Sequence, residues 1–196
     1  SDDYTKEKKQ IYDFFEASKS SLDLKEVSDL RYAAMKDCFK GTKRVYIHAD
    51  ELQQLQDVID FVQHFDLKFP VIVGGYDSYL LARKLKDAEI PVMLFRTHSL
   101  PSREDDPIDL PFKIASKLQE EGVLFCIQNE GDMEAMNARN LPFLAGTCRA
   151  YGLTNEQAIA AISINACKIM GIDKNFGSIE VGKSATLFVS EGDALD

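Results

Sequence analysis

The sequence has no tryptophan, only three histidines and only four cysteines among its 196 residues. No two cysteines form a Cys-x-x-Cys pair, and Cys126 and Cys167 lie in apolar stretches. We therefore expect buried free thiols, with a disulfide or metal role as the alternative, and a reducing compartment, most simply the cytoplasm. Basic residues are also few, since 23 Lys and Arg stand against 32 Asp and Glu, for a formal charge of −9. This balance disfavours nucleic acid or an anionic membrane surface as the main partner.

Several signatures of known chemistry are missing as well. No apolar run approaches the roughly 18 residues of a membrane span. The first residues, 1–4, show no basic-then-apolar signal pattern. There is no Gly-x-Ser-x-Gly elbow, and Gly74-Gly75 alone is weak support for a phosphate-binding loop. Nothing in the sequence therefore predicts a nucleotide-binding or serine-hydrolase domain.

The chain does contain a repeated strand–helix unit. Its predicted strands are short, continuously apolar and without alternation, which is typical of strands buried on both faces of a parallel sheet. Their spacing of roughly 20 to 30 residues suits successive βα units. The expected strands are 45–47, 70–73, 91–95 and 122–127, and the expected helices between them are 51–65, 76–87 and 108–120.

Further helical patterns flank this repeat. Thr154 and Gln157 form a capping box, because each side chain can accept a hydrogen bond from the free backbone N–H of the other residue. Asn165 is expected to cap a short helix at 166–170. The remaining expectations are helices at 7–17, 24–38 and 141–151 and a final isolated strand at 185–189.

The C-terminal part of the chain carries a long, spaced motif. It covers residues 165–172, with the sequence NACKIMGI, and residues 177–187, with the sequence GSIEVGKSATL. This motif resembles the closing signature of the amidohydrolase superfamily, with Cys167 in place of an alanine and Thr186 in place of an aspartate. Residues 150–158 look like the helix pair that precedes the signature, and the nearest branch is the imidazolonepropionase-like amidohydrolases.

The resemblance implies an α/β fold, a (β/α)8 TIM-like barrel with a small β-sandwich built from both chain termini. The four predicted strands would be strands five to eight of that barrel. We therefore predict a partial barrel with covering helices over residues 1–176 and a C-terminal β appendage over 177–196. Half a barrel exposes sheet edges, so we expect self-association, pairing with a missing N-terminal half, or a loop or helix over the edge.

The resemblance also implies a metal-dependent active site at the carboxyl ends of the strands. Residues 47–50, with the sequence IHAD, resemble the strand-five ligand motif, so His48 is the candidate metal ligand, with a structural histidine as the alternative. Gly74 stands where the family has its strand-six histidine, and glycine offers no donor atom. The family's strand-eight aspartate falls near Asn129 or Glu130. Glu130 is therefore the candidate catalytic residue, as ligand or base, with a solvated loop carboxylate as the alternative.

Three further residues are candidates for substrate binding. Tyr76 follows the second predicted strand, and Arg96 and His98 follow the third. The alternative for His98 is a loop histidine in solvent.

The implied function is hydrolysis of C–N bonds other than peptide bonds, in cyclic amides, by a zinc or other divalent metal ion that activates water. We expect the substrate to be a small molecule and the chain alone to be inactive, without a metal. One alternative is a pseudoenzyme or binding scaffold that has lost its metal ligands. Another is a stand-alone α/β binding module, because fold does not fix function.

Overall fold

The computed structural model of the protein describes residues 2–23, 29–129 and 134–195. Its centre is a parallel sheet of four strands in the order β1-β2-β3-β4. In β1 and β2, Tyr46 lies beside Val71 and His48 beside Val73. The four segments predicted as strands all form strands, with the bounds β1 (Val45–Ala49), β2 (Pro70–Gly74), β3 (Val92–Leu94) and β4 (Phe125–Ile127).

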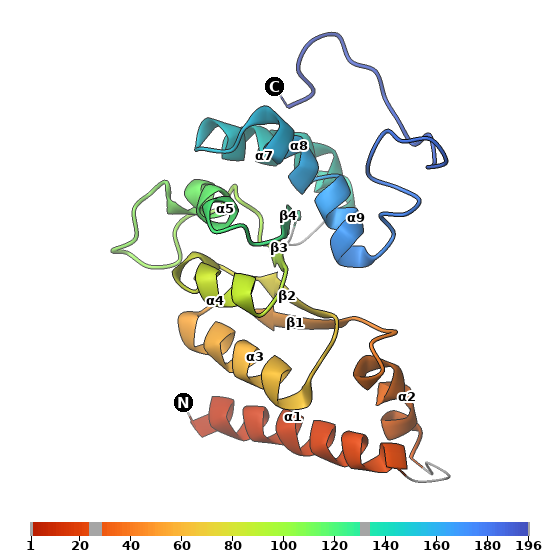
Figure 1. Ribbon diagram of the computed structural model, residues 1–196. Coiled ribbons are helices and arrows are strands. Elements are labelled where there is room, and N and C mark those ends of the chain that lie inside the picture. The colour runs from red at the N-terminus through yellow and green to blue at the C-terminus, as the bar shows by residue number, and fades with distance from the viewer. Residues whose placement is uncertain (1, 24–28, 130–133, 196) are drawn as a thin grey trace.

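Helices cover one face of this sheet, as Figure 1 shows. They are α3 (Leu52–Phe65), α4 (Ala82–Asp87) and α5 (Leu110–Glu120), and each lies between two consecutive strands in the chain. The expected helix at 76–87 is shorter than predicted, because Asp77 N–H donates to the Asp50 carbonyl at 2.8 Å and holds a turn there. The side chains between sheet and helices are fully buried, among them Ile72, Val92, Leu94 and Phe125.

The opposite face of the sheet is covered unevenly. Helix α9 (Ile164–Met170) lies against it, where Ile169 forms a small buried cluster with Val71 and Cys126. All residues of β4 are buried, next to α9, α7 (Leu141–Ala150) and α8 (Asn155–Ala161). At the other edge, Tyr46 of β1 is 46% exposed and His48 is also exposed. The open part of the sheet is therefore β1.

Helix α1 (Asp2–Ser20) adds a further layer outside α3. Aromatic rings join the two helices, with the ring of Phe15 4.7 Å from that of Phe61 and 5.3 Å from that of Phe65. Polar bonds add to this, since Tyr4 Oη and Lys8 Nζ each lie 2.7 Å from an oxygen of Asp57. Helix α2 (Leu30–Phe39) packs beside α1.

The N-terminal cap of α8 agrees with the sequence prediction, because Thr154 Oγ1 accepts from Gln157 N–H and Gln157 Oε1 accepts from Thr154 N–H. The prediction that Asn165 caps α9 is wrong: α9 begins at Ile164, so Asn165 lies inside its first turn. The shorter elements are the 3-10 turns η1 (Ser21–Asp23), η2 (Ser78–Leu80) and η3 (Ala138–Asn140) and the helix α6 (Glu134–Asn137).

The C-terminal segment differs from expectation. Residues 185–189 form no strand, and Phe188 and Val189 are 75% and 99% exposed. A strand needs a partner edge, and the strand pairs of the described residues lie within β1–β4. The segment instead returns to α7, where Leu195 is buried and Asp193 forms an ion pair with Arg149. The expected β-sandwich strand is therefore not present in the described part of the chain.

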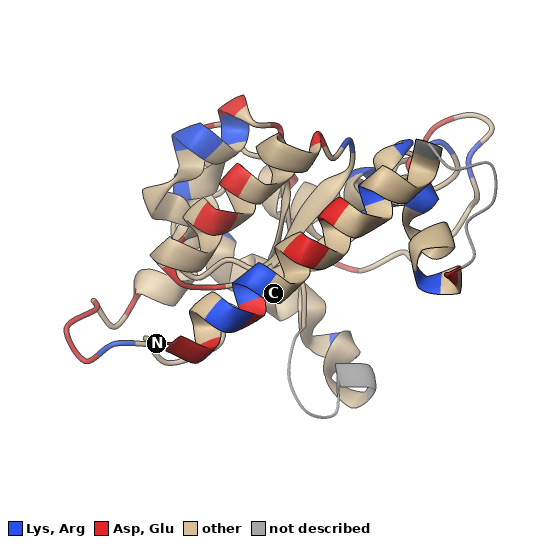
Figure 2. Cartoon of the chain, turned by 90° about the horizontal axis from the view of Figure 1, so that it is seen from below, with Lys and Arg blue, Asp and Glu red and all other residues tan. Residues whose placement is uncertain are grey.

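Charged residues of both signs are interspersed along the helices, whereas the four strands carry none (Figure 2). In the part of the chain that the structure describes, no helix is both long and apolar enough to cross a membrane.

Candidate substrate pocket

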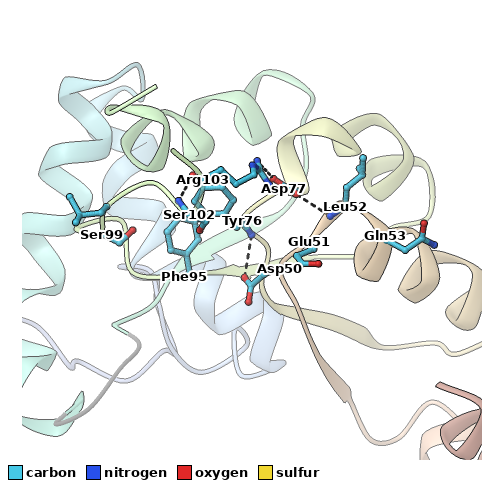
Figure 3. Close-up of a pocket in the computed structure, with 11 residues that line it drawn as sticks. Asp50, Glu51, Leu52, Gln53, Tyr76, Asp77, Phe95, Ser99, Ser102 and Arg103 are labelled. Carbon is cyan, nitrogen blue, oxygen red and sulfur yellow. Dashed lines mark hydrogen bonds and ion pairs between the residues drawn. The ribbon is translucent and has the colours of Figure 1, made fainter. Parts of the chain in front are cut away.

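A cavity of about 620 Å³ opens at the carboxyl ends of β1, β2 and β3. Its walls come from the segments that follow these strands, namely residues 50–53, residues 76–77, and residues 95, 99, 100, 102 and 103 (Figure 3). In barrel enzymes this end of the strands carries the reacting groups. The cavity is therefore the candidate functional site among the described residues.

The carboxylate of Asp50 lies directly over Gly74. Asp50 Oδ1 accepts a hydrogen bond from Tyr76 N–H at 3.3 Å, drawn as a dashed line in Figure 3. A Cβ atom on Gly74 would lie only 2.5 Å from Asp50 Oδ1, and Gly74 has a φ of +108°. A side chain at position 74 would thus meet both an occupied space and an unfavourable backbone conformation.

An ion pair between the buried Asp77 and the exposed Arg103 joins the β2 end to the loop after β3. Asp77 is 3% exposed and receives two bonds from Arg103, at 3.0 Å from Nη1 and 2.7 Å from Nη2. Leu52 N–H at the start of α3 also donates to Asp77 at 3.0 Å. This paired geometry fixes the loop over the pocket, because two parallel bonds to a carboxylate define both distance and orientation. Hydrogen bonding to Asp77 raises the pKa of Arg103 further above its ordinary value.

Tyr76 contributes its ring, not its hydroxyl group, to the pocket. The hydroxyl donates to Asp106 Oδ2 at 2.7 Å and accepts from Ser102 N–H at 3.0 Å. The ring lies 5.4 Å from that of Phe95, centroid to centroid, and 5.3 Å from the Arg103 guanidinium. Burial is the largest cause of the raised pKa of Tyr76. The two rings form an aromatic wall that suits a flat, partly apolar ligand.

The charge left free in the pocket is negative. Arg103 is committed to Asp77 and, at 3.3 Å, to Asp106. Asp50 and Glu51 form no ion pair within the described ranges. The arrangement can therefore accept hydrogen bonds from, or pair with, a ligand group that carries N–H donors.

The structure places the predicted substrate-binding residues in two regions. Tyr76 lines the pocket, whereas Arg96 and His98 are not among its lining residues. His98 turns toward α7, with Nε2 2.6 Å from Thr147 Oγ1. Burial, and then the charge of Arg96, lower the pKa of His98. The roles of all three residues in substrate binding stay predictions.

Of the two residues predicted for chemistry, the structure describes only His48. His48 lies exposed on β1, with its register partner Val73 on the neighbouring strand. Glu130 lies outside the described residues. Sequence reasoning also missed Asp77, Arg103 and Asp106. A signal for Asp77 was present, because it stands two residues after the Gly74-Gly75 pair at the end of a predicted buried strand.

Parallel strands, helices over one face and a pocket at the carboxyl ends of the strands are features of an α/β barrel-like fold. Residues 24–195 match the Amidohydrolase family, and the chain belongs to that family.

Similar proteins point to one branch. The imidazolonepropionase of Symbiobacterium thermophilum is 26% identical over 146 residues, which are 74% of this chain and 33% of that protein. The imidazolonepropionase of Flavobacterium psychrophilum is 31% identical over 85 residues, which are 43% of this chain and 21% of that protein. The crystal structure of an amidohydrolase from Thermotoga maritima has a TM-score of 0.71 at 23% identity, covering 93% of this chain and 47% of that chain. The chain thus spans about half of that structure and a third or less of these relatives.

Divalent metal ions are general cofactors of this family. Within the ranges that the structure describes, no three His, Cys, Asp or Glu side chains lie close enough to hold such an ion. The position at Gly74 is also filled by the Asp50 carboxylate. The described residues therefore do not fit a complete metal site by themselves.

Proposed function

We propose that the pocket at the ends of β1–β3 is one wall of the substrate site of a hydrolase that cleaves C–N bonds in cyclic amides. The position of the pocket carries this proposal, since it lies where barrel enzymes bind substrate. Membership of the Amidohydrolase family and likeness to imidazolonepropionases support the reaction class. A planar cyclic amide would lie against Tyr76 and Phe95, with its N–H groups toward Asp50.

The individual roles form part of the same proposal. His48, on β1, is the metal ligand that this chain contributes, and Glu130 is the catalytic carboxylate. Arg96 and His98 contact the parts of the substrate that extend beyond the pocket toward α7. We derive no reaction step through a metal ion, because the described residues provide no complete ligand set.

The chain alone is expected to be inactive. Among the described strands β1 pairs only with β2, so its other edge is a place where the sheet can continue. The remaining strands would come from another part of the protein, from a separate polypeptide or from a second copy of this chain. Any of these would complete the pocket on its open side.

Metal content and turnover test the proposal together. Plasma mass spectrometry would measure metal per chain in the natural full-length protein, in this chain alone, and in His48→Ala. His64→Ala is the matched control, because His64 is exposed and pairs with Glu16 on the outer surface. We expect near-stoichiometric metal in the full-length protein and in His64→Ala, and its loss in His48→Ala. We also expect the full-length protein to hydrolyse imidazolone-type cyclic amides. No metal and no turnover in the full-length protein would exclude the hydrolase.

A second candidate function is a binding scaffold without catalysis. The observation that favours it is the Asp50 carboxylate over Gly74, in the place where the family's strand-six histidine would begin. A scaffold would bind cyclic amides without hydrolysing them, and binding would weaken in Phe95→Ala. Turnover by the full-length protein would exclude this candidate.

A further inference from the structure

A second cavity, of about 320 Å³, lies at the opposite end of the same strands. Its lining comes from the residues that lead into the sheet, including Arg44 before β1, Phe69 before β2 and Leu124 before β4. It is therefore separate from the proposed substrate pocket and shares no lining residue with it.

The charged lining of this cavity is mostly basic. Among the lining residues that the structure describes, four cationic side chains come from four separate parts of the fold, and Glu89 is the single acidic one. The formal charge of the whole chain is −9, so this concentration of positive charge runs against the overall balance. The four cations are Arg44, Lys68, Lys86 and Lys168.

Arg44 is held in place without a carboxylate. Its Nε donates to the carbonyl oxygen of Ile169 at the end of α9. Its guanidinium covers Gly171, where a Cβ atom would overlap it, and lies 5.2 Å from the ring centre of Phe69. Gly171 has a φ of +72°, so both its conformation and the position of Arg44 favour glycine. A carbonyl, a glycine and a ring thus orient a cation that forms no ion pair with a carboxylate of the described residues.

Two of the lysines also keep their charge available. Neither Lys86 nor Lys168 forms an ion pair with a carboxylate of the described residues, and both are exposed. Lys68 differs, because Asp66 lies 2.7 Å from its Nζ. Three unpaired cations therefore face one small cavity.

The floor of the cavity is apolar. Val71, Ile90 and Ile169 are almost completely buried, and Phe69 is 45% exposed at the rim. A small ion alone would leave this surface in contact with water. The lining matches a ligand with an apolar body and an anionic group.

We propose that this cavity binds a small organic anion, with its phosphate or carboxylate group between Arg44, Lys86 and Lys168 and its apolar body on the Val71 and Ile169 floor. Phosphate and carboxylate share the chemistry that a guanidinium recognises through paired N–H donors. The site lies away from the carboxyl ends of the strands, so binding there does not depend on the proposed hydrolase activity.

Titration calorimetry on the natural full-length protein tests the proposal with defined probes. Phenyl phosphate and benzoate share an apolar ring and differ in the anion, inorganic phosphate lacks the ring, and benzyl alcohol lacks the charge. We expect one of the two aromatic anions to bind at least about tenfold more tightly than inorganic phosphate and benzyl alcohol, and more weakly at higher salt. The tighter of the two identifies the anionic group. Equal affinity of all four probes, or no binding at millimolar concentrations, would overturn the proposal.

Variants locate the binding. Lys86→Gln and Lys168→Gln should each lower the affinity for the aromatic anion by several-fold, and Arg44→Gln should lower it by about tenfold. Lys174→Gln is the matched control, because Lys174 is exposed and does not line the cavity. If Arg44→Gln disturbs α9, the two lysine variants still test the site. Neither lysine forms an ion pair with a described carboxylate, so its replacement should leave the fold unchanged. An equal loss in Lys174→Gln would reject the site, and retained hydrolysis in all variants would keep this result separate from the proposed function.

Discussion

Asp50 and Gly74 are matched across two neighbouring strand ends. Asp50 Oδ1 lies 2.5 Å from the point where a Cβ of residue 74 would be, and it accepts the N–H of Tyr76 at 3.3 Å. The missing side chain of one residue therefore makes room for the carboxylate of the other. The family's strand-six histidine could not simply be restored here while Asp50 keeps its place.

Gly74→Ala should lower the free energy of unfolding by about 3 kcal/mol, through backbone strain at φ +108° and displacement of Asp50. Urea unfolding measures this. The matched control is Gly182→Ala, because Gly182 has a φ of +92° but no atom within 4 Å of an added Cβ. The double variant Gly74→Ala, Asp50→Ala should recover the part of the lost stability that comes from contact between the new Cβ and the Asp50 carboxylate. Equal losses in Gly74→Ala and Gly182→Ala would contradict the argument.

Arg103→Met should destabilise the protein by about 2 kcal/mol, because it leaves the buried Asp77 carboxylate with a single backbone donor. The loop at 96–109 should also become easier to cleave by protease. Arg83→Met removes an exposed ion pair with Asp87 and should cost at most about 0.5 kcal/mol. Unfolding curves and limited proteolysis check both variants, and similar behaviour of the two would count against the role of Asp77.

Two buried thiols predict a loss of stability at alkaline pH. Burial raises the pKa of Cys126 and Cys148 to about 12, from the ordinary value of 9.0 that applies in the unfolded chain. The contribution of these two thiols to the free energy of unfolding is fully present below about pH 9. It is lost as the pH rises toward 12, at about 1.4 kcal/mol per pH unit for each thiol. The free energy of unfolding, measured with urea across this pH range, should decline less steeply in Cys148→Ala than in the unchanged protein. The half-buried Cys167, changed to Ala, is the control, and identical slopes in all three proteins would refute the prediction.

His98 should titrate below its ordinary value of 6.5, because burial and then Arg96 lower its pKa. The neutral ring is favoured in the folded protein. Its contribution to stability is therefore present above pH 6.5 and is lost as the pH falls through the lowered pKa. Imidazole NMR signals follow this titration directly. Arg96→Gln should move the pKa of His98 upward and Arg83→Gln should not; an unchanged value in both would show that Arg96 has no part in the shift.

The strand–helix repeat could be predicted because its pattern is local. Continuous apolar segments such as 70–73 have few alternatives to a buried strand, and the Thr154 capping box needs only two residues three apart in the chain. The Asn165 cap failed because Asn165 is one residue inside the helix, and the polar residue alone does not fix the boundary. The strand expected at 185–189 depended on a partner that the described residues do not provide.

The pocket was harder to predict than the fold. Tyr76 was expected near a substrate from its place after a strand, and it does line the cavity. The Asp77–Arg103 pair joins residues 26 apart in the sequence, and no local pattern encodes such a contact. The orientation of His98 toward Thr147 depends on where α7 packs, which is again a property of the tertiary structure.

The aromatic contact between α1 and α3 determines how short a fragment of this protein can be. Residues 24–195 match the family, yet the ring of Phe15, outside that range, lies 4.7 Å from Phe61. A fragment cut at the family boundary would leave the outer side of α3 as a bare apolar surface. Such a piece is expected to precipitate, so any shortened version should begin before α1.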